Sequence, residues 1–591
     1  MGQDYFLAEV SFEAGNKVGG IWTVLTSKSG TMKKLFGDDY LAVGFYNQKQ
    51  ASTEVMEETP PDAIKKAISE MGLDGVDVHY GRWVSANEVK IVLIDSSGFK
   101  ERHVNEVKKT FWDLFKIDSL DAPNDYNEPI AWAYAAGVFL EKLSSQIGKR
   151  LVVQVHEWLS AGSILYLKSK NSRIPTNFTI HATVLGRAIS YNGGDTIAFI
   201  NSNTAVDVSM PYKYGVNAKH CTEKAGAFNA TVFTVVSRIV EKEAEVILGK
   251  KADFITLNGI DTLEMPNVDD LDSISDAARS KFENFVDSYF LPYYDFQAED
   301  LPVFITGGRY EFYDKGFDLF IDSLGRLDKK LQAGKGVIAL VAVPTGTIGV
   351  KNEVAANYLA YLSIKSSLDE DIKRFDVAAS SVLSKNTGRL DKAYSKILND
   401  EKRLLSNLRK TKPSNPPVCP FLLSYPEEND MIITRLRQNG LENSPDNKVK
   451  VIFYPKYLSF GDELLNLTYY EVLAMSTAGF FLSKYEPFGY TPLEAASYMS
   501  IAFTTDHAGF GIYCTEKFKT ELKGIVVEKL TGNQRDKVVE QIANDMLKIV
   551  NMPEDDILRL KISARKVSEN FGWESFISYY LQAYDAALKR A

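Results

Sequence analysis

The sequence predicts an α/β protein in which two doubly wound parallel sheets face each other across a cleft. Short apolar segments of strand length alternate with helical segments from Tyr5 to about Asp261, and the alternation returns from Val303 to about Tyr513. A chain of 591 residues with 45% hydrophobic content is long enough for two or three cores. Ligands bind at the carboxyl ends of the strands in such sheets, so functional side chains are expected directly after strands.

The composition excludes several classes of protein. Lys and Arg number 68 against 77 Asp and Glu, and the net charge of −9 lacks the basic footprint of a nucleic-acid-binding protein. No apolar run reaches the roughly 18 residues of a membrane helix, and no secretory signal is visible. The 3 cysteines are odd in number and far apart, which argues against a disulfide framework or a zinc cluster. We therefore expect a cytoplasmic protein that binds neither nucleic acid nor membrane.

The most informative segment follows the apolar stretch Phe480–Leu482, which has the character of a buried strand end. Thr491 is predicted as the N-cap of a helix, with Pro492 at the first helical position and Glu494 completing a capping box. A helix that starts directly after a strand presents free backbone N–H groups and a positive dipole end. This arrangement predicts a site for a pyrophosphate.

The surroundings of this helix start, from Glu486 to Glu494, resemble the glycogen synthases of the animal and fungal type, glycosyltransferase family 3. The resemblance implies that Glu486 lies beside the transferred glucose and that Glu494 contacts the ribose of a nucleotide. It also implies that the backbone of Gly489, Tyr490 and Thr491 holds the phosphates. On the residues alone, an alternative remains in which Glu494 only caps its helix and Glu486 is a solvated loop residue.

Arg309 and Lys315 lie six positions apart after the apolar run Val303–Ile305. A nucleoside diphosphate gains negative charge as it leaves a sugar, and fixed cations in a dry cleft stabilise that charge. In the resembled family an arginine and a lysine at this spacing stabilise the departing diphosphate. For an isolated pair of cations, a solvated loop is the alternative interpretation.

A third segment places His181 at the end of a strand and Arg187 six positions later. It resembles the family's His-Ala-Thr-Leu-Leu-Gly-Arg segment, whose histidine touches the donor glucose and whose arginine supports the phosphates. A single histidine at a strand end is otherwise more often a core residue. His156-Glu157-Trp158 also resembles a family motif, and we expect it to support the site without touching the substrate.

Further binding residues are expected in three other segments. Lys17, Gly19 and Gly20 follow the first strand, where the glycines allow close approach to a ligand, and the resemblance places this loop at the donor cleft. The loop is not Gly-x-Gly-x-x-Gly, so a dinucleotide-binding dehydrogenase is poorly supported. By resemblance, Asn258 also binds substrate and Tyr469 stacks on the uracil, although an aromatic residue on a helix is more often part of a core.

The family has the GT-B architecture, which implies the following organisation. Residues 1–265 form an N-terminal Rossmann-like domain on the acceptor side, residues 266–566 form a C-terminal one on the nucleotide-sugar side, and residues 567–591 form a helix that crosses back. A polar helical insertion at about 353–412 has an apolar face made by Leu390, Tyr394, Ile397, Leu404, Leu405 and Leu408. The insertion forms tetramer contacts in the family, so a homo-oligomer is expected; a hairpin packed on its own domain is the alternative.

The resemblance implies a retaining transfer of glucose from UDP-glucose to the nonreducing end of an α-1,4-glucan, with glycogen and a primer protein as partners. Alternatives are the same reaction with ADP-glucose, or a silent scaffold that binds glucan or nucleotide. A phosphorylase that uses pyridoxal would need a lysine that forms a Schiff base with the cofactor, and we recognise no sequence motif for such a lysine. We expect neither metal nor cofactor, because the Asp-x-Asp at 270–272 lies in an acidic stretch between the domains.

The animal and fungal enzymes bind glucose 6-phosphate on an arginine-rich helix. The corresponding part of this chain offers a thinner set of cations, Arg559, Lys561, Arg565 and Lys566. A phosphate monoester carries nearly two negative charges and requires several converging donors. We therefore expect weak or no activation by sugar phosphates.

Overall fold

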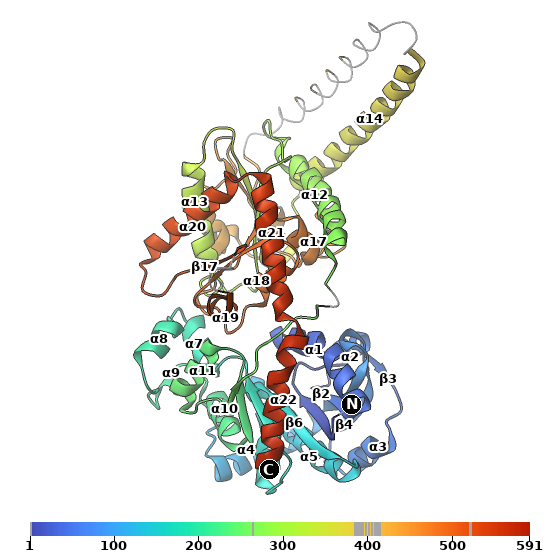
Figure 1. The fold of residues 1–591 in the computed structure, drawn as a ribbon, viewed down its shortest axis with the longest axis vertical. Coiled ribbons are helices and arrows are strands. Elements are labelled where there is room, and N and C mark those ends of the chain that lie inside the picture. Colours follow the sequence, from blue (N-terminus) through green and yellow to red (C-terminus); the bar gives the residue numbers. More distant parts are fainter. Residues whose placement is uncertain are drawn as a thin grey trace.

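The computed structural model describes residues 3–262, 265–382, 415–518 and 523–591, together with positions 395, 399, 402 and 406. Figure 1 shows the described chain as two bodies stacked along the long axis, with the first half of the sequence in one and most of the second half in the other. Each body contains one large, mainly parallel sheet with helices on both faces. The predicted fold class is thus confirmed.

The first sheet has nine strands in the order β3-β4-β5-β2-β1-β6-β7-β8-β9. Its strands are β1 (Tyr5–Val10), β2 (Tyr40–Phe45), β3 (Val55–Glu57), β4 (Asp77–Trp83), β5 (Val89–Asp95), β6 (Arg150–His156), β7 (Thr176–Ile180), β8 (Val232–Val235) and β9 (Phe254–Ile255). All pairs are parallel except the β3-β4 and β4-β5 pairs at one edge. The strand order reverses between β1 and β6, and this switch point is where doubly wound sheets bind their ligands.

The second sheet has six parallel strands in the order β14-β11-β10-β15-β16-β17. Its strands are β10 (Val303–Gly307), β11 (Val337–Ala342), β14 (Val449–Tyr454), β15 (Ala478–Phe480), β16 (Ile501–Thr505) and β17 (Ile525–Glu528), and a separate hairpin pairs β12 (Thr347–Val350) with β13 (Phe421–Leu423). The switch point lies between β10 and β15. The segments after these two strands carry Arg309, Lys315 and Glu486.

The helices of the first body cover both faces of its sheet. They are α1 (Gly20–Phe36), α2 (Gln48–Glu54), α3 (Asp62–Ser69), α4 (Ser97–Phe115), α5 (Asn124–Gln146), α6 (Glu157–Ser169), α7 (Val184–Tyr191), α8 (Thr196–Ser202), α9 (Met210–Lys213), α10 (Asn217–Asn229) and α11 (Arg238–Glu243). Alternate residues of β1 enter different cores: Phe6 and Ala8 pack with α5 and α6, whereas Tyr5 and Leu7 pack with α1. This alternation follows from the two-residue period of a strand.

The second body contains α12 (Val268–Phe290), α13 (Phe317–Lys330), α14 (Asn352–Val382), α16 (Met431–Gln438), α17 (Tyr469–Met475), α18 (Tyr490–Ser497), α19 (Gly509–Phe518), α20 (Arg535–Val550) and α21 (Glu554–Ser568). Figure 1 shows α14 projecting away from this body. The start of the predicted insertion is therefore helical as expected, but the six residues assigned to its apolar face lie outside the described residues. None of the described helices is long and apolar enough to cross a membrane.

The chain returns to the first body through α22 (Trp573–Arg590), which Figure 1 shows running down from α21. Trp573, Tyr580 and Tyr584 of α22 are fully buried in the same core as Tyr5 and Leu7. The prediction of a single helix over 567–591 is wrong in one respect, because a 3₁₀ turn at Glu569–Phe571 separates α21 from α22. The break occurs where the chain bonds to the first body, with the N–H of Ile260 donating to Phe571 O and that of Trp573 donating to Ile260 O.

Candidate active site

The centre of the site is an ion pair between Lys315 and Glu486, whose Nζ and Oε2 atoms are 2.5 Å apart. Two loops hold it: the N–H of Lys484 donates to the carbonyl of Asp314, and Gly316 lies so close to Leu482 O that a Cβ would approach within 2.0 Å. Burial would raise the pKa of Glu486, but the Lys315 ammonium outweighs it and lowers that pKa. Glu486 is therefore an ionised carboxylate at neutral pH.

Two guanidinium groups face the same carboxylate. Arg309 and Arg187 both contribute electrostatically to the lowered pKa of Glu486. The Arg309 side chain is 61% exposed and its only ion pair among the described residues is with the neighbouring Glu311, at 3.1 Å. Arg187 is exposed and forms no ion pair with a described residue. The structure thus brings Arg187, Arg309, Lys315 and Glu486 together, and it leaves the two arginines accessible to an anion.

The helix start after Glu486 differs from the prediction. Gly489, with φ of 106°, is the N-cap of α18, so Thr491 lies inside the first turn and caps nothing. Only glycine adopts this conformation without strain, which explains why the helix begins two residues earlier than expected. Glu494 makes no capping box either; the hydroxyl of Tyr470 donates to it at 3.4 Å. Burial raises the pKa of Glu494 to about 7, and the nearby hydroxyls of Tyr470 and Tyr469 lower it only partly.

His181 lies at the end of β7 and is only 6% exposed. Its Nε2 atom is 3.0 Å from Nδ1 of His156, and its backbone N–H donates to Glu157 Oε1 at 2.8 Å. Glu157 has a φ of 65°, a strained conformation for this residue, which turns its carboxylate toward the end of the neighbouring strand. The His156-Glu157 pair therefore holds the ring and the backbone of His181 at once, as the expected supporting role requires.

The loop after β1 is arranged by a residue that sequence reasoning missed. Glu13 is 8% exposed and accepts hydrogen bonds from the N–H groups of Gly19 at 2.9 Å and Trp22 at 3.0 Å. Burial raises the pKa of Glu13, and the two N–H groups, with the charges of Arg187 and Arg309, offset this effect only in part. Gly20 begins α1 next to this carboxylate. Lys17 instead places its ammonium 4.4 Å from the ring centre of Trp22.

Side chains next to Glu486 join the two bodies. The hydroxyl of Tyr485 donates to Glu243 at 2.9 Å, and its ring belongs to the core of the first body. The hydroxyl of Tyr490 donates to Gly259 O at 3.1 Å. Asn258, the neighbour of Gly259, is 2% exposed, and its Oδ1 atom has no hydrogen-bond partner among the described residues. An unpaired buried acceptor of this kind is a candidate contact for a ligand.

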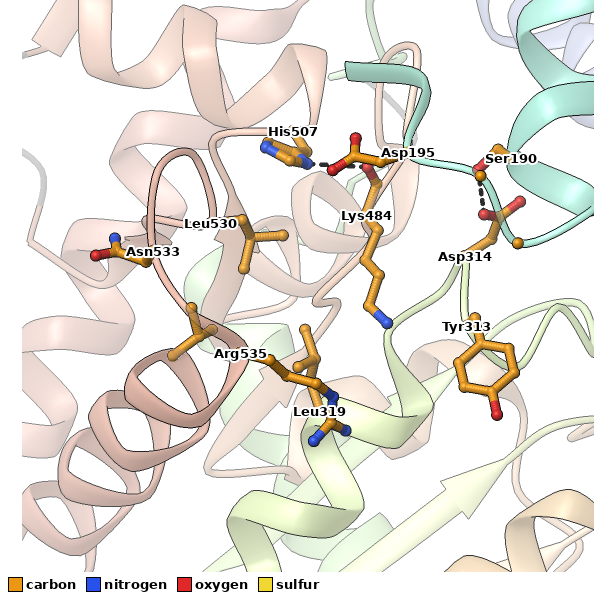
Figure 2. A pocket seen from close by; sticks show the side chains of 13 residues that line it. Ser190, Asp195, Tyr313, Asp314, Leu319, Lys484, His507, Leu530, Asn533 and Arg535 are labelled. Carbon is orange, nitrogen blue, oxygen red and sulfur yellow. Dashed lines mark hydrogen bonds between the residues drawn. The ribbon is translucent and has the colours of Figure 1, made fainter. Parts of the chain in front are cut away.

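A pocket of about 380 Å³ lies between the two bodies, and Figure 2 shows side chains that line it. Ser190 and Asp195 line it from the first body, and Tyr313, Lys484 and Arg535 line it from the second. The Lys484 ammonium bonds to Asp318 at 2.9 Å, and the Arg535 guanidinium bonds to Asp318 at 3.0 Å and to Asp322 at 2.6 Å. Both cations are thus neutralised. The pocket offers polar groups, the Asp195 and Asp314 carboxylates and the half-exposed Tyr313 ring, and both of these cations in its wall are paired.

The other missed residues are buried carboxylates. Glu223 and Glu243 accept hydrogen bonds from the N–H groups of Val184 and Thr183 at the start of α7, at 3.1 and 2.9 Å. Nothing in the local sequence distinguishes them from solvated glutamates, because only the fold brings them to the helix start. Within the described ranges, no group of three or more His, Cys, Asp or Glu side chains has the arrangement of a metal site.

Two facing Rossmann-like bodies with a helix that crosses back, and a cleft lined by cations and one carboxylate, define a glycosyltransferase of the GT-B class. The catalytic domain of starch synthase IV from Arabidopsis thaliana shares the fold with a TM-score of 0.53 and 15% identity, covering 99% of this chain and 100% of that one. The chain belongs to the glycogen synthase family, whose model matches residues 9–591.

The similarity to curated relatives of this family extends over the whole length of this chain. The similarity is 30% identity to glycogen [starch] synthase isoform 1 of Saccharomyces cerevisiae, covering 100% of this chain and 86% of that protein. It is 29% to glycogen [starch] synthase of Neurospora crassa, with 100% and 84% covered. It is 28% to the liver glycogen [starch] synthase of Mus musculus, also with 100% and 84% covered.

Proposed function

We propose that this glycosyltransferase is a glycogen synthase that moves glucose from UDP-glucose to the nonreducing end of an α-1,4-glucan, with retention at the anomeric carbon. The observation that carries the proposal is the convergence of Arg187, Arg309 and Lys315 on the Glu486 carboxylate, next to the switch point of the second sheet. A diphosphate leaving group needs such cations, and an ionised carboxylate next to them suits a sugar carbon that becomes positive. Membership of the glycogen synthase family supports the choice of substrates.

In the proposed reaction, the bond between the anomeric carbon and the diphosphate oxygen breaks and its electron pair stays on that oxygen. Arg309, Lys315 and the N–H groups at the start of α18 stabilise the charge that develops there. The acceptor hydroxyl forms the new bond to the same carbon and gives its proton to the departing diphosphate. Glu486 stabilises positive charge on the sugar ring or orients the glucose.

The nucleoside is assigned to the opposite end of the cleft. Tyr469 would stack on the base and Glu494 would accept hydrogen bonds from the ribose hydroxyls, since both lie together on α17 and α18. Gly489, Tyr490 and Thr491 would contact the phosphates, and Asn258 with the Lys17-Gly19-Gly20 loop would close the cleft from the first body. Uridine is favoured by family membership, and adenosine is the alternative base.

We assign the pocket between the bodies to the glucan. Asp314 and Lys484 of its wall lie one and two positions from Lys315 and Glu486 in the chain, which supports a place for the glucan close to the reacting carbon. Because its cations are paired, it suits a neutral polyhydroxylated chain better than a diphosphate. The Tyr313 ring, in a side chain that is 52% exposed, offers an apolar face against which a sugar ring packs.

The deciding experiment measures diphosphate release by the purified protein from UDP-glucose and, separately, from ADP-glucose, with and without glycogen. Glycogen-dependent release that Glu486→Ala and Arg309→Ala both abolish would establish the synthase, and the better donor would name the base. Binding of glycogen without turnover of either donor would replace the proposal by a silent scaffold.

Replacing Tyr313 with alanine is expected to raise the KM for short α-glucans about fivefold, because an aromatic contact contributes about 1 kcal/mol. The KM for the nucleotide sugar and kcat at saturating glucan should stay within a factor of two. Initial rates with maltooligosaccharides of increasing length give these values. Tyr457→Ala, which removes a tyrosine that is 79% exposed, serves as the control. Equal effects of the two substitutions would exclude the glucan assignment.

Donor affinity is expected to depend on pH through Glu494. Its pKa of about 7 means that the carboxylate form, which accepts hydrogen bonds from ribose best, is a minor species at pH 6 and the major one at pH 8. UDP should therefore bind about tenfold more tightly at pH 8 than at pH 6 relative to Glu494→Gln, in which the group cannot ionise. Calorimetric titration gives the Kd of UDP for both proteins at each pH. The ratio of the two Kd values removes the effect of the ionisation of UDP itself. A constant ratio across this range would remove Glu494 from the ribose site.

Activation by glucose 6-phosphate is expected to stay below about twofold in initial-rate assays. Arg565 is 7% exposed, with its guanidinium bonded to Ser497 O, to Pro266 O at 3.1 Å and to Glu569 at 3.1 Å. Arg559 is paired with Asp556 at 2.8 Å. Cations occupied in this way cannot converge on a phosphate without losing existing bonds. A large activation would show that the helix rearranges around the ligand.

A further inference from the structure

Behind His181, four side chains form one continuous hydrogen-bonded row inside the first body. Lys28 Nζ lies 2.5 Å from Glu9 Oε1, His156 Nε2 lies 2.8 Å from the same oxygen, and His156 Nδ1 lies 3.0 Å from His181 Nε2. The side chains of Lys28 and Glu9 are completely buried. The hydroxyl of Tyr40 donates to the other oxygen of Glu9. None of the roles proposed above uses this buried charge pair, and burying two charges is costly.

The row fixes where each proton lies. Burial would raise the pKa of Glu9, but Lys28 and the hydrogen bond to His156 outweigh it and hold that pKa well below its usual range. An ionised carboxylate only accepts hydrogen bonds, so His156 must donate to it through Nε2. Burial also lowers the pKa of His156 below its ordinary value, so the ring is neutral and its Nδ1 atom is an acceptor.

The same reasoning continues to the substrate side. Because Nδ1 of His156 only accepts, the 3.0 Å contact requires Nε2 of His181 to donate. Burial, with the nearby charge of Arg187, lowers the pKa of His181, so this ring is neutral as well. Its Nδ1 atom then carries a lone pair, and no described residue donates a hydrogen bond to it.

We propose that Glu9 is a positioning residue that fixes His181 in its Nε2–H tautomer, so that Nδ1 of His181 accepts a hydrogen bond from a hydroxyl of the donor sugar. The part of this inference that concerns the sugar rests on the proposed function. Glu157 already anchors the backbone of His181, so the tautomer is the remaining property that decides whether the ring accepts or donates. Lys28 keeps Glu9 ionised and is itself enclosed by α22, with its ammonium 4.5 Å from the ring centre of Tyr580.

The direct test is spectroscopic and needs no turnover. The chain has 6 histidines, so solid-state NMR of protein labelled with ¹⁵N and ¹³C in histidine gives few signals, and His156→Asn and His181→Asn assign the two of interest. Both rings are expected to be neutral with the proton on Nε2. A proton on Nδ1 of His181, or a charged ring at neutral pH, would overturn the inference.

A charge-neutral double variant tests the consequence for the sugar. Glu9→Gln together with Lys28→Met leaves no unpaired buried charge. The amide that replaces the Glu9 carboxylate can donate or accept a hydrogen bond, so His156 can take either tautomer. We expect two populations of His181 tautomer and a fall of up to about fivefold in kcat/KM for the donor, since one hydrogen bond contributes about 1 kcal/mol. The Kd of UDP, which has no glucose, should change less than twofold. Tyr40→Phe, which alters only the other oxygen of Glu9, should keep the single tautomer.

Donors that lack one hydroxyl each separate positioning from general damage. The donors are the nucleotide sugars of 2-, 3-, 4- and 6-deoxyglucose. One of them lacks the hydroxyl that bonds to His181 in the proposal, and with that donor the double variant and the unaltered protein should have the same kcat/KM. An equal loss with every donor, or a parallel loss of UDP affinity, would mean that the row only stabilises the fold. If no donor is turned over by the unaltered protein, the proposed function fails, while the histidine spectra still decide the tautomer.

Discussion

Lys315→Ala is expected to lower kcat by two to three orders of magnitude. The ammonium contacts Glu486 at 2.5 Å and would stabilise the departing diphosphate, and loss of one such group typically costs about 3 to 4 kcal/mol in the transition state. The pKa of Glu486 should rise at the same time, because Lys315 is the main cause of its depression. Initial rates at saturating donor and glycogen, measured from pH 5 to 8, should therefore show the loss and an upward shift of the acidic limb.

The chain provides a matched control for this substitution. Lys351 and Glu427 form an ion pair of 2.6 Å with side-chain exposures of 16% and 28%, close to the 2.5 Å, 18% and 20% of Lys315 and Glu486. Lys351→Ala removes an equivalent pair outside the cleft and should change kcat less than twofold. Similar losses in both variants would mean that Lys315 acts through stability and not on the reaction.

Trp573→Ala is expected to reduce the stability of the first body by about 3 to 5 kcal/mol. The side chain is fully buried in the core shared by α1 and α22, and its Nε1–H donates to Ser27 Oγ at 2.9 Å. Truncation leaves a cavity and removes the hydrogen bond to Ser27. The midpoint of thermal unfolding followed by circular dichroism should fall by roughly 10 °C.

Trp112 offers the comparison for this change. It is the same residue type, also on a helix of the first body, but it is 49% exposed. Trp112→Ala should move the midpoint by less than about 2 °C. A small shift for Trp573→Ala as well would show that α22 is dispensable for the stability of the first body.

Local signals were sufficient to predict the parts of the site that follow strands directly. The segments after β10 and β15 carry Arg309, Lys315 and Glu486 within a few residues of an apolar run, and parallel topology brings adjacent strand ends together. The resemblance to glycosyltransferase family 3 was needed to place residues from the two halves of the chain in one site. Their catalytic and binding roles stay predictions.

The errors and omissions have a common physical origin. Thr491 has the side chain of a good N-cap, but Gly489 reaches a backbone conformation that no neighbouring residue adopts easily and starts the helix first. Glu157, Glu223 and Glu243 accept hydrogen bonds from N–H groups of segments that are distant in the sequence, and the fold buries them there. A sequence window predicts solvated glutamates at all three positions, since it contains neither the donors nor the burial.

Tyr485 and Glu486 are joined by a single peptide bond but belong to opposite sides of the cleft. The tyrosine ring is held in the first body by Glu243, and the glutamate is held in the second by Lys315. Any separation of the two bodies would require the tyrosine ring to leave its core or the glutamate to leave its lysine. The geometry of the Lys315–Glu486 ion pair is therefore coupled to the contact between the two bodies through one peptide bond.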